Sequence, residues 1–91
     1  MAEFLNATPD EIAFGLNMTT LTVHLARALG REWSAGDEVI VTELDHHGNV
    51  APWQALAQER GIVLRTLPLR VDDGTLDLGG LARVLGPKTR L

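Results

Sequence analysis

The sequence predicts an α/β protein built on a parallel β-sheet with alternating helices, and three observations support this fold class. Short, largely apolar segments at 11–15, 38–44 and 62–69 are typical of buried strands. The segments between them, 17–30 and 49–60, repeat apolar residues at the spacing of one helix face. Strands and helices that alternate in this way indicate parallel pairing with right-handed crossovers.

The first predicted strand is EIAFG, from Glu11 to Gly15, which ends at a glycine. The helix that follows opens at Asn17, a residue type that favours N-caps, and stops near Gly30. Gly15 and Asn17 also tolerate unusual backbone angles.

The central strand and its helix have clear signals. EVIVTEL (38–44) is β-branched and almost wholly apolar, as expected for a strand that is covered on both faces. Asn49 is then a suitable N-cap for a helix that runs to Arg60. Pro52 would lie in the first turn of this helix, where its missing N–H costs nothing, and Gly61 would end it.

The C-terminal part continues the alternation. A third strand is predicted at 62–69, followed by a turn or extended passage, and Asp77 is placed to cap a short helix that runs through Val84. Residues 88–91, KTRL, are typical of the approach to another strand. Three parallel strands leave two open edges and little cover for both faces. We therefore expect residues 1–91 to be one partial domain of a larger α/β protein.

Composition excludes several kinds of protein. The chain has 91 residues, a hydrophobic fraction of 45%, a formal net charge of −4 and no cysteine. Disulfides, thiolate metal sites and a cysteine nucleophile are thus excluded within this chain. Basic residues are dispersed rather than clustered, which argues against a nucleic-acid partner. The apolar runs are too short to span a membrane and the N-terminus lacks signal-peptide features, so we expect a cytoplasmic protein.

Two segments carry polar residues directly after predicted strands, where ligands bind in parallel sheets. The first, GLNMTT, places Asn17, Thr19 and Thr20 at the start of a helix, where free N–H groups and hydroxyls suit a phosphate. The same residue types are also ordinary N-caps, so capping alone is the alternative. The second segment, LDHHGN, follows the next strand. Parallel pairing should bring both segments to the same edge of the sheet.

The DHH triplet in the second segment has three interpretations. Asp45, His46 and His47 are metal-ligand types, but adjacent histidines in an extended chain point in opposite directions and rarely reach one ion. One imidazole could instead stack on the ring of an organic cofactor. In the third interpretation Asp45 and Asn49 cap the turn, and the histidines are solvated.

The triplet also resembles the DHH phosphoesterases, which use this motif with other aspartates to hold divalent metals. That family carries an earlier aspartate motif, whereas the first predicted strand here ends in FGLN, without an acid. A divalent-metal phosphoesterase that uses Asp45, His46 and His47 is therefore one alternative function. A non-catalytic α/β interaction fragment is another.

A longer resemblance runs collinearly from Phe4 to Leu91. The segments FGLNMTT, GDEVIVTELDHHGNVAPWQ and DGTLDL, with KTRL after them, occur in that order. Together they resemble the cofactor domain of class V aminotransferases, and within that class the cysteine desulfurases, which depend on pyridoxal phosphate. The resemblance implies that this chain is the front part of the large domain of such an enzyme.

Residue by residue, the resemblance implies a cofactor site. The phosphate loop of the family falls on Asn17, Met18 and Thr19, whose backbone N–H groups, with the Thr19 hydroxyl, would bind the cofactor phosphate. The histidine that stacks on the pyridine ring falls on His46, whereas His47 matches a variable position and is assigned no role. Asn17 replaces the usual glycine and Met18 replaces the usual alanine or threonine, and neither change removes a backbone donor.

The same resemblance implies which groups lie elsewhere. The aspartate that pairs with the pyridine nitrogen and the lysine that forms the Schiff base lie beyond residue 91 in the family, and both are needed for catalysis. The only lysine here, Lys88, matches a structural position. No catalytic residue is thus assigned, and we expect the chain alone to be inactive. The complete enzyme would be a homodimer that acts on an amino acid by desulfuration, transamination, lyase or epimerase chemistry.

Overall fold

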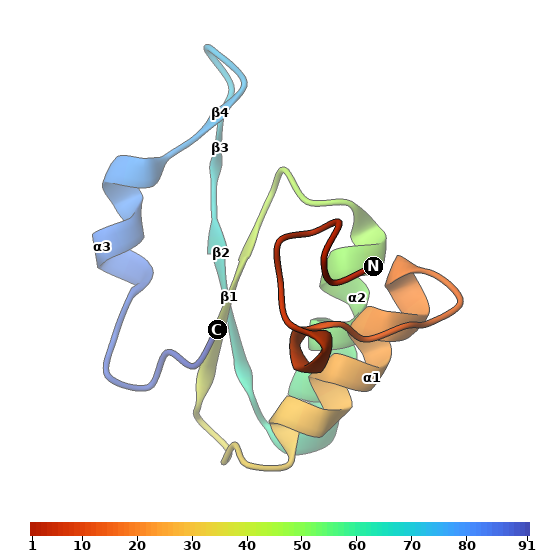
Figure 1. Ribbon diagram of the computed structural model, residues 1–91. Helices are drawn as coiled ribbons and strands as arrows, with labels where there is room; N and C mark the ends of the chain where they lie inside the picture. Colours follow the sequence, from red (N-terminus) through yellow and green to blue (C-terminus); the bar gives the residue numbers. More distant parts are fainter.

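The computed structural model describes all 91 residues, and its fold is α/β with a parallel strand pair, as predicted. Strands β1 (Glu38–Thr42) and β2 (Val63–Leu67) pair in parallel, with Glu38 opposite Val63. Helices α1 (Met18–Gly30) and α2 (His47–Arg60) pack together on one face of this pair (Figure 1). Both helices start at the end of the layer where the strands finish. Their N-termini therefore share an edge with the carboxyl ends of β1 and β2.

Capping residues set most helix ends. The Asn17 side chain accepts a hydrogen bond from the Thr20 N–H at 2.9 Å, which satisfies one of the free donors in the first turn of α1. Gly30 ends α1 against α2, where a Cβ would lie only 2.5 Å from Leu56 Cδ1. Gly61 ends α2 in the left-handed conformation, with φ 72°. These three predicted limits are confirmed.

The start of α2 differs from the prediction. His46, rather than Asn49, is the N-cap, because its ring accepts the Gly48 N–H and its carbonyl accepts the Asn49 N–H. The prediction of Asn49 as the cap is therefore wrong. The helix begins three residues earlier than that cap implied, so Pro52 lies in the second turn rather than the first.

The core fills the space between the strands and the two helices. Val39 and Val41 alternate along β1 toward the helices, and both are buried. Trp53 and Leu56 of α2 pack against them, and the Trp53 ring stacks on Trp33 at a centroid distance of 6.2 Å. This packing fixes α2, and with it the loop that precedes α2, beside the end of β1.

Residues 11–15 do not form the predicted strand. Pro9–Glu11 is instead a short 3-10 turn (η1), in which the Glu11 carboxylate accepts the N–H and the hydroxyl of Thr8. A strand requires a partner for its backbone groups, and no segment of the chain pairs with residues 11–15. Phe14 is correspondingly 80% exposed. The prediction is wrong because an apolar segment forms a strand only where a neighbouring strand pairs with its backbone.

The third predicted strand is shorter than 62–69. β2 ends at Leu67, because Pro68 has no N–H with which to continue the ladder. The passage predicted as turn or extended contains a hairpin of β3 (Leu69–Arg70) and β4 (Thr75–Leu76). In Figure 1 this hairpin projects beyond the parallel strands.

A short helical segment follows the hairpin, as predicted. The Asp77 carboxylate accepts the Gly80 N–H at 3.2 Å and caps a 3-10 turn, η2 (Leu78–Gly80). This turn leads directly into α3 (Leu81–Val84). α3 lies on the side of the strands opposite α1 and α2 (Figure 1).

Residues 88–91 run beside β1 in parallel, on the edge opposite β2. Glu38 and Thr89 form a bridge, and the Ile40 N–H donates to the Leu91 carbonyl at 2.8 Å. The predicted approach to a further strand is therefore confirmed. β1 is the central strand of the layer.

The chain leaves much apolar surface uncovered. Its accessible surface is 6651 Å², against about 5,200 Å² from the size scaling of compact proteins. The radius of gyration of 15.0 Å also exceeds the roughly 12 Å expected for a compact chain of this length. Phe4, Leu16 and Val71 are each at least 86% exposed. No helix combines the length and the apolar character needed to cross a membrane.

Candidate cofactor-binding site

The start of α1 forms the first part of the site. Asn17 has an ordinary extended backbone (φ −164°), so this position does not require glycine. Its side chain holds the Thr20 N–H, whereas the N–H groups of Met18 and Thr19 donate to no group in the chain. Such groups carry the partial positive charge of a helix N-terminus, to which anions bind. The Met18 sulfur lies 3.4 Å from the Thr22 hydroxyl, so Met18 offers the site its backbone rather than its side chain.

The loop between β1 and α2 forms the second part. His46 Nδ1 accepts the Gly48 N–H at 3.0 Å. A neutral imidazole with its proton on Nε2 satisfies this bond. His46 is otherwise exposed to solvent. One ring nitrogen is therefore held locally, while Nε2 and the faces of the ring stay available.

Asp45 ties the end of β1 to the first turn of α2. Its Oδ2 accepts the Thr42 hydroxyl at 2.7 Å, and its Oδ1 accepts the Asn49 side-chain amide at 3.2 Å. The Thr42 hydroxyl, followed by the Asn49 amide, lowers the pKa of the Asp45 carboxyl, against an opposing effect of burial. Asp45 and Asn49 thus hold this turn through side-chain hydrogen bonds, whereas the cap of α2 itself is His46. Because these bonds span His46, they fix where the loop presents that ring.

The two parts of the site meet at Gly48. A Cβ placed on Gly48 would lie 2.9 Å from Thr19 Oγ1 and 3.1 Å from His46 Nδ1. A hydroxyl from α1 and an imidazole from the loop before α2 thus approach the same point. The expectation that both segments share one edge of the sheet is confirmed. Gly48 escapes prediction from the sequence, although a glycine in the first turn of a helix, beside a candidate ligand, can indicate such a close approach.

The DHH triplet does not assemble a set of metal ligands. No group of three or more His, Cys, Asp and Glu side chains in the chain is placed to hold one ion. Both carboxylate oxygens of Asp45 accept hydrogen bonds from neighbouring side chains, and His46 Nδ1 is engaged by the backbone. His47 opens α2 as an exposed residue. This geometry does not support the phosphoesterase interpretation.

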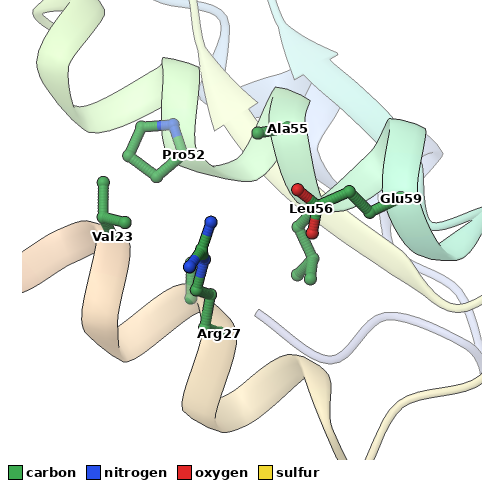
Figure 2. Close-up of a pocket in the computed structure, with 7 residues that line it drawn as sticks. Val23, Arg27, Pro52, Ala55, Leu56 and Glu59 are labelled. Atoms are coloured by element: carbon green, nitrogen blue, oxygen red, sulfur yellow. The ribbon is translucent and has the colours of Figure 1, made fainter.

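A small cavity lies apart from this site, between α1 and α2 (Figure 2). Its volume is about 50 Å³, too small for an organic cofactor. Val23 and Arg27 line it from α1, and Pro52, Leu56 and Glu59 line it from α2. In Figure 2 the Arg27 guanidinium extends from α1 into the space between the helices. None of the predicted cofactor residues contributes to this cavity.

Comparison with known sequences finds relatives along the whole chain. The family model for Aminotransferase class-V matches residues 1–91. The chain is 44% identical to a cysteine desulfurase of Serratia proteamaculans over 93 residues, which cover 100% of this chain and 23% of that protein. It is 41% identical over 92 residues to a probable cysteine desulfurase of Pseudomonas aeruginosa, with the same two coverages.

Solved structures give the same relationship. The cysteine desulfurase from Thermococcus onnurineus NA1 superposes with a TM-score of 0.81 at 33% identity, over 90% of this chain and 20% of that one. A C-DES mutant with glycine covalently linked to its PLP cofactor superposes with a TM-score of 0.80 at 37% identity, over 98% of this chain and 23% of that one.

These matches define the class of protein as the pyridoxal phosphate-dependent, cysteine desulfurase-like enzymes. The chain belongs to the aminotransferase class-V family. It spans about 23% of the length of the curated relatives that it matches. The resemblance inferred from the sequence is therefore confirmed at the level of the family.

Proposed function

We propose that residues 1–91 form the phosphate-binding and ring-stacking part of a pyridoxal phosphate site, in an enzyme that acts on an amino acid. The proposal depends above all on one observation, the convergence of Thr19 and His46 on Gly48. Cysteine is the substrate that we favour, because relatives of the chain are cysteine desulfurases. A structural neighbour with glycine covalently linked to PLP supports the cofactor.

The cofactor phosphate would bind at the start of α1. The unpaired N–H groups of Met18 and Thr19 offer backbone donors at the positive end of the helix dipole, and the Thr19 hydroxyl adds a side-chain donor. Asn17 would contribute indirectly, because its hydrogen bond to the Thr20 N–H fixes the first turn from which these donors project. Hydrogen bonds to a charged phosphate are among the stronger ones in proteins.

His46 would lie against the pyridine ring. The bond from the Gly48 N–H to Nδ1 restrains the imidazole at one nitrogen and leaves its flat faces for stacking. Asp45 holds the backbone on either side of His46 through Thr42 and Asn49. When bound, pyridoxal phosphate supplies the electron sink for amino-acid chemistry. The residues of this chain would bind and orient that group.

Lys88 is remote from these residues. Its Nζ lies 3.5 Å from the Cβ position of Gly36, in the turn that leads into β1, whereas His46 follows the other end of β1. We therefore assign Lys88 no catalytic role. The covalent lysine and the substrate-binding residues would come from outside residues 1–91. A homodimer and a cytoplasmic location remain predictions.

A hybrid enzyme tests the proposal. In it, residues 1–91 replace the aligned segment of the Serratia proteamaculans cysteine desulfurase, so that the other three quarters of the relatives' length are present. We expect the purified hybrid to bind pyridoxal phosphate, measured by its visible absorbance, and to release sulfur from cysteine. A matched control combines Thr19→Ala with His46→Asn and should fold but bind the cofactor at least about tenfold more weakly.

Two results would overturn the proposal. The first is a folded hybrid that binds no pyridoxal phosphate. The second is a double variant that binds the cofactor as tightly as the hybrid, since the phosphate and ring contacts would then lie elsewhere. Circular dichroism of each protein establishes that it is folded before the cofactor is added.

A further inference from the structure

We infer that Gly48 is a positioning residue of the proposed site, one that acts through Thr19. Its missing side chain lets the Thr19 hydroxyl and the His46 ring occupy the same small region at the start of α1 and α2. The inference rests on the proposed function and adds to it a residue that offers the cofactor no side chain. Gly48 governs whether Thr19 can point into the site.

Gly48 matters because it leaves space for its neighbours, and not because its backbone conformation requires glycine. Its φ is outside the left-handed region, so an alanine could adopt the same conformation. A Cβ would nevertheless stand 2.9 Å from Thr19 Oγ1, closer than a carbon and an oxygen pack, and 3.1 Å from His46 Nδ1. One of the two neighbours would have to move.

Thr19 is the neighbour that we expect to move. Its hydroxyl ends a short side chain with alternative staggered rotamers, and no hydrogen bond within the chain holds it. The His46 ring is instead tied to the Gly48 N–H through Nδ1. A methyl group on residue 48 would therefore turn the Thr19 hydroxyl out of the phosphate position and leave the cap of α2 in place.

Gly48→Ala should change the affinity for the cofactor rather than the stability of the protein. Alanine forms helices more readily than glycine, so Gly48→Ala should not weaken α2 through backbone preference. The loss of the Thr19 donor should weaken binding of the phosphate. A purely structural role for Gly48 predicts a different pattern, in which thermal stability falls and affinity falls only as a consequence.

Gly30 supplies a matched control for the same substitution. It also faces a side chain at short range, since a Cβ there would lie 2.5 Å from Leu56 Cδ1. It stands at the end of α1 remote from Thr19. Gly30→Ala should lower the melting temperature and leave the Kd for pyridoxal phosphate unchanged.

The test is a double-mutant cycle in the hybrid enzyme, prepared without cofactor. The Kd for pyridoxal phosphate is measured by equilibrium dialysis, and the melting temperature of each cofactor-free protein by circular dichroism. We expect Gly48→Ala to raise the Kd about tenfold in the hybrid. In the Thr19→Ala background it should raise the Kd less than about twofold, because no hydroxyl remains to be displaced.

Each other outcome has a definite meaning. An equal rise in Kd in both backgrounds, or no rise in either, overturns the inference. If Gly48→Ala lowers the melting temperature as much as Gly30→Ala does, the double variant decides between the two roles. A melting temperature that recovers in the Thr19→Ala background supports the contact with Thr19. A melting temperature that stays low contradicts it. Failure of the proposed function is distinct, because Thr19→Ala itself would then leave the Kd unchanged.

Discussion

The hydroxyl oxygen of Thr19 lies 2.9 Å from the position that a Cβ on Gly48 would occupy, although the two residues belong to different helices. This contact joins the first turns of α1 and α2 at the edge where β1 ends. It places the free N–H groups of α1 beside the loop that carries His46. The candidate site is therefore a product of how the two helices pack, and its residues can be tested one at a time.

Removal of the Thr19 hydroxyl should weaken cofactor binding selectively. A hydrogen bond to a charged group contributes about 1.5–3 kcal/mol, so Thr19→Ala in the hybrid should raise the Kd for pyridoxal phosphate roughly 10- to 100-fold. Thr22→Ala is the control, because the Thr22 hydroxyl bonds the Met18 carbonyl at 2.9 Å inside the same helix. Equal effects of the two substitutions in equilibrium dialysis would show that Thr19 has no special role.

Two substitutions separate the roles of His46. Asparagine is a strong N-cap without a ring, so His46→Asn should preserve the stability of α2. It should weaken binding of the cofactor by about two- to tenfold, which is the range expected for the loss of one aromatic contact. His46→Phe keeps a flat ring and loses the cap, so it should lower the melting temperature and retain most of the affinity. The stacking role is contradicted if His46→Phe weakens binding of the cofactor as much as His46→Asn does.

Metal removal should leave the hybrid unaffected. The Asp45 oxygens and His46 Nδ1 already accept hydrogen bonds within the chain, and no three ligand side chains converge. Prolonged dialysis against EDTA should therefore change neither the cofactor absorbance nor sulfur release. His47→Ala should likewise leave both unchanged. Sulfur release that is lost on dialysis and restored by Mn²⁺ would contradict this expectation.

Stability should depend on pH through Asp37. The buried Asp37 carboxylate accepts the Ser34 N–H at 2.9 Å and pairs with Arg90 at 3.3 Å. The Ser34 N–H, and after it Arg90, lowers the pKa of Asp37 below its ordinary value. A lowered folded-state pKa stabilises the protein above the unfolded-state pKa of about 3.9, and this contribution is lost as the pH falls through the folded-state value.

Asp37→Asn measures that contribution. At pH 7 the variant of the hybrid should melt a few degrees below the hybrid, because an amide cannot pair with Arg90. At pH 3 the gap between the two melting temperatures should narrow, since below a pH of about 3.9 the unfolded chain binds a proton at this carboxyl more readily than the native protein does. A gap of the same size at both values would mean that the charge of Asp37 does not stabilise the fold.

Elements defined by local chemistry could be predicted from the sequence. The Asn17 cap, the glycine that ends α2 and the β-branched run of β1 each depend on residues within one or two turns. The approach of residues 88–91 to a further strand was also predictable, because their pattern and the alternation before them agree. The phosphate and ring-stacking roles of Thr19 and His46 came from the family resemblance and stay predictions.

The features that were missed depend on neighbours distant in the sequence. The apolar run at 11–15 lacks a partner strand in this chain, which composition cannot reveal. His46 caps α2 in place of Asn49, the residue that cap preferences favour, and the Asn49 side chain instead donates to Asp45. Gly48 matters only because α1 packs beside α2. Sequence patterns identify the candidate ligands, whereas packing decides which of them meet.

The most direct test of the central claim is a crystal structure of the hybrid enzyme with pyridoxal phosphate bound. The claim predicts that a phosphate oxygen lies within hydrogen-bond distance of Thr19 Oγ1 and of the N–H groups at the start of α1. It also predicts that the His46 ring lies flat against the pyridine. A phosphate bound away from α1, or a His46 ring turned from the cofactor, would contradict it.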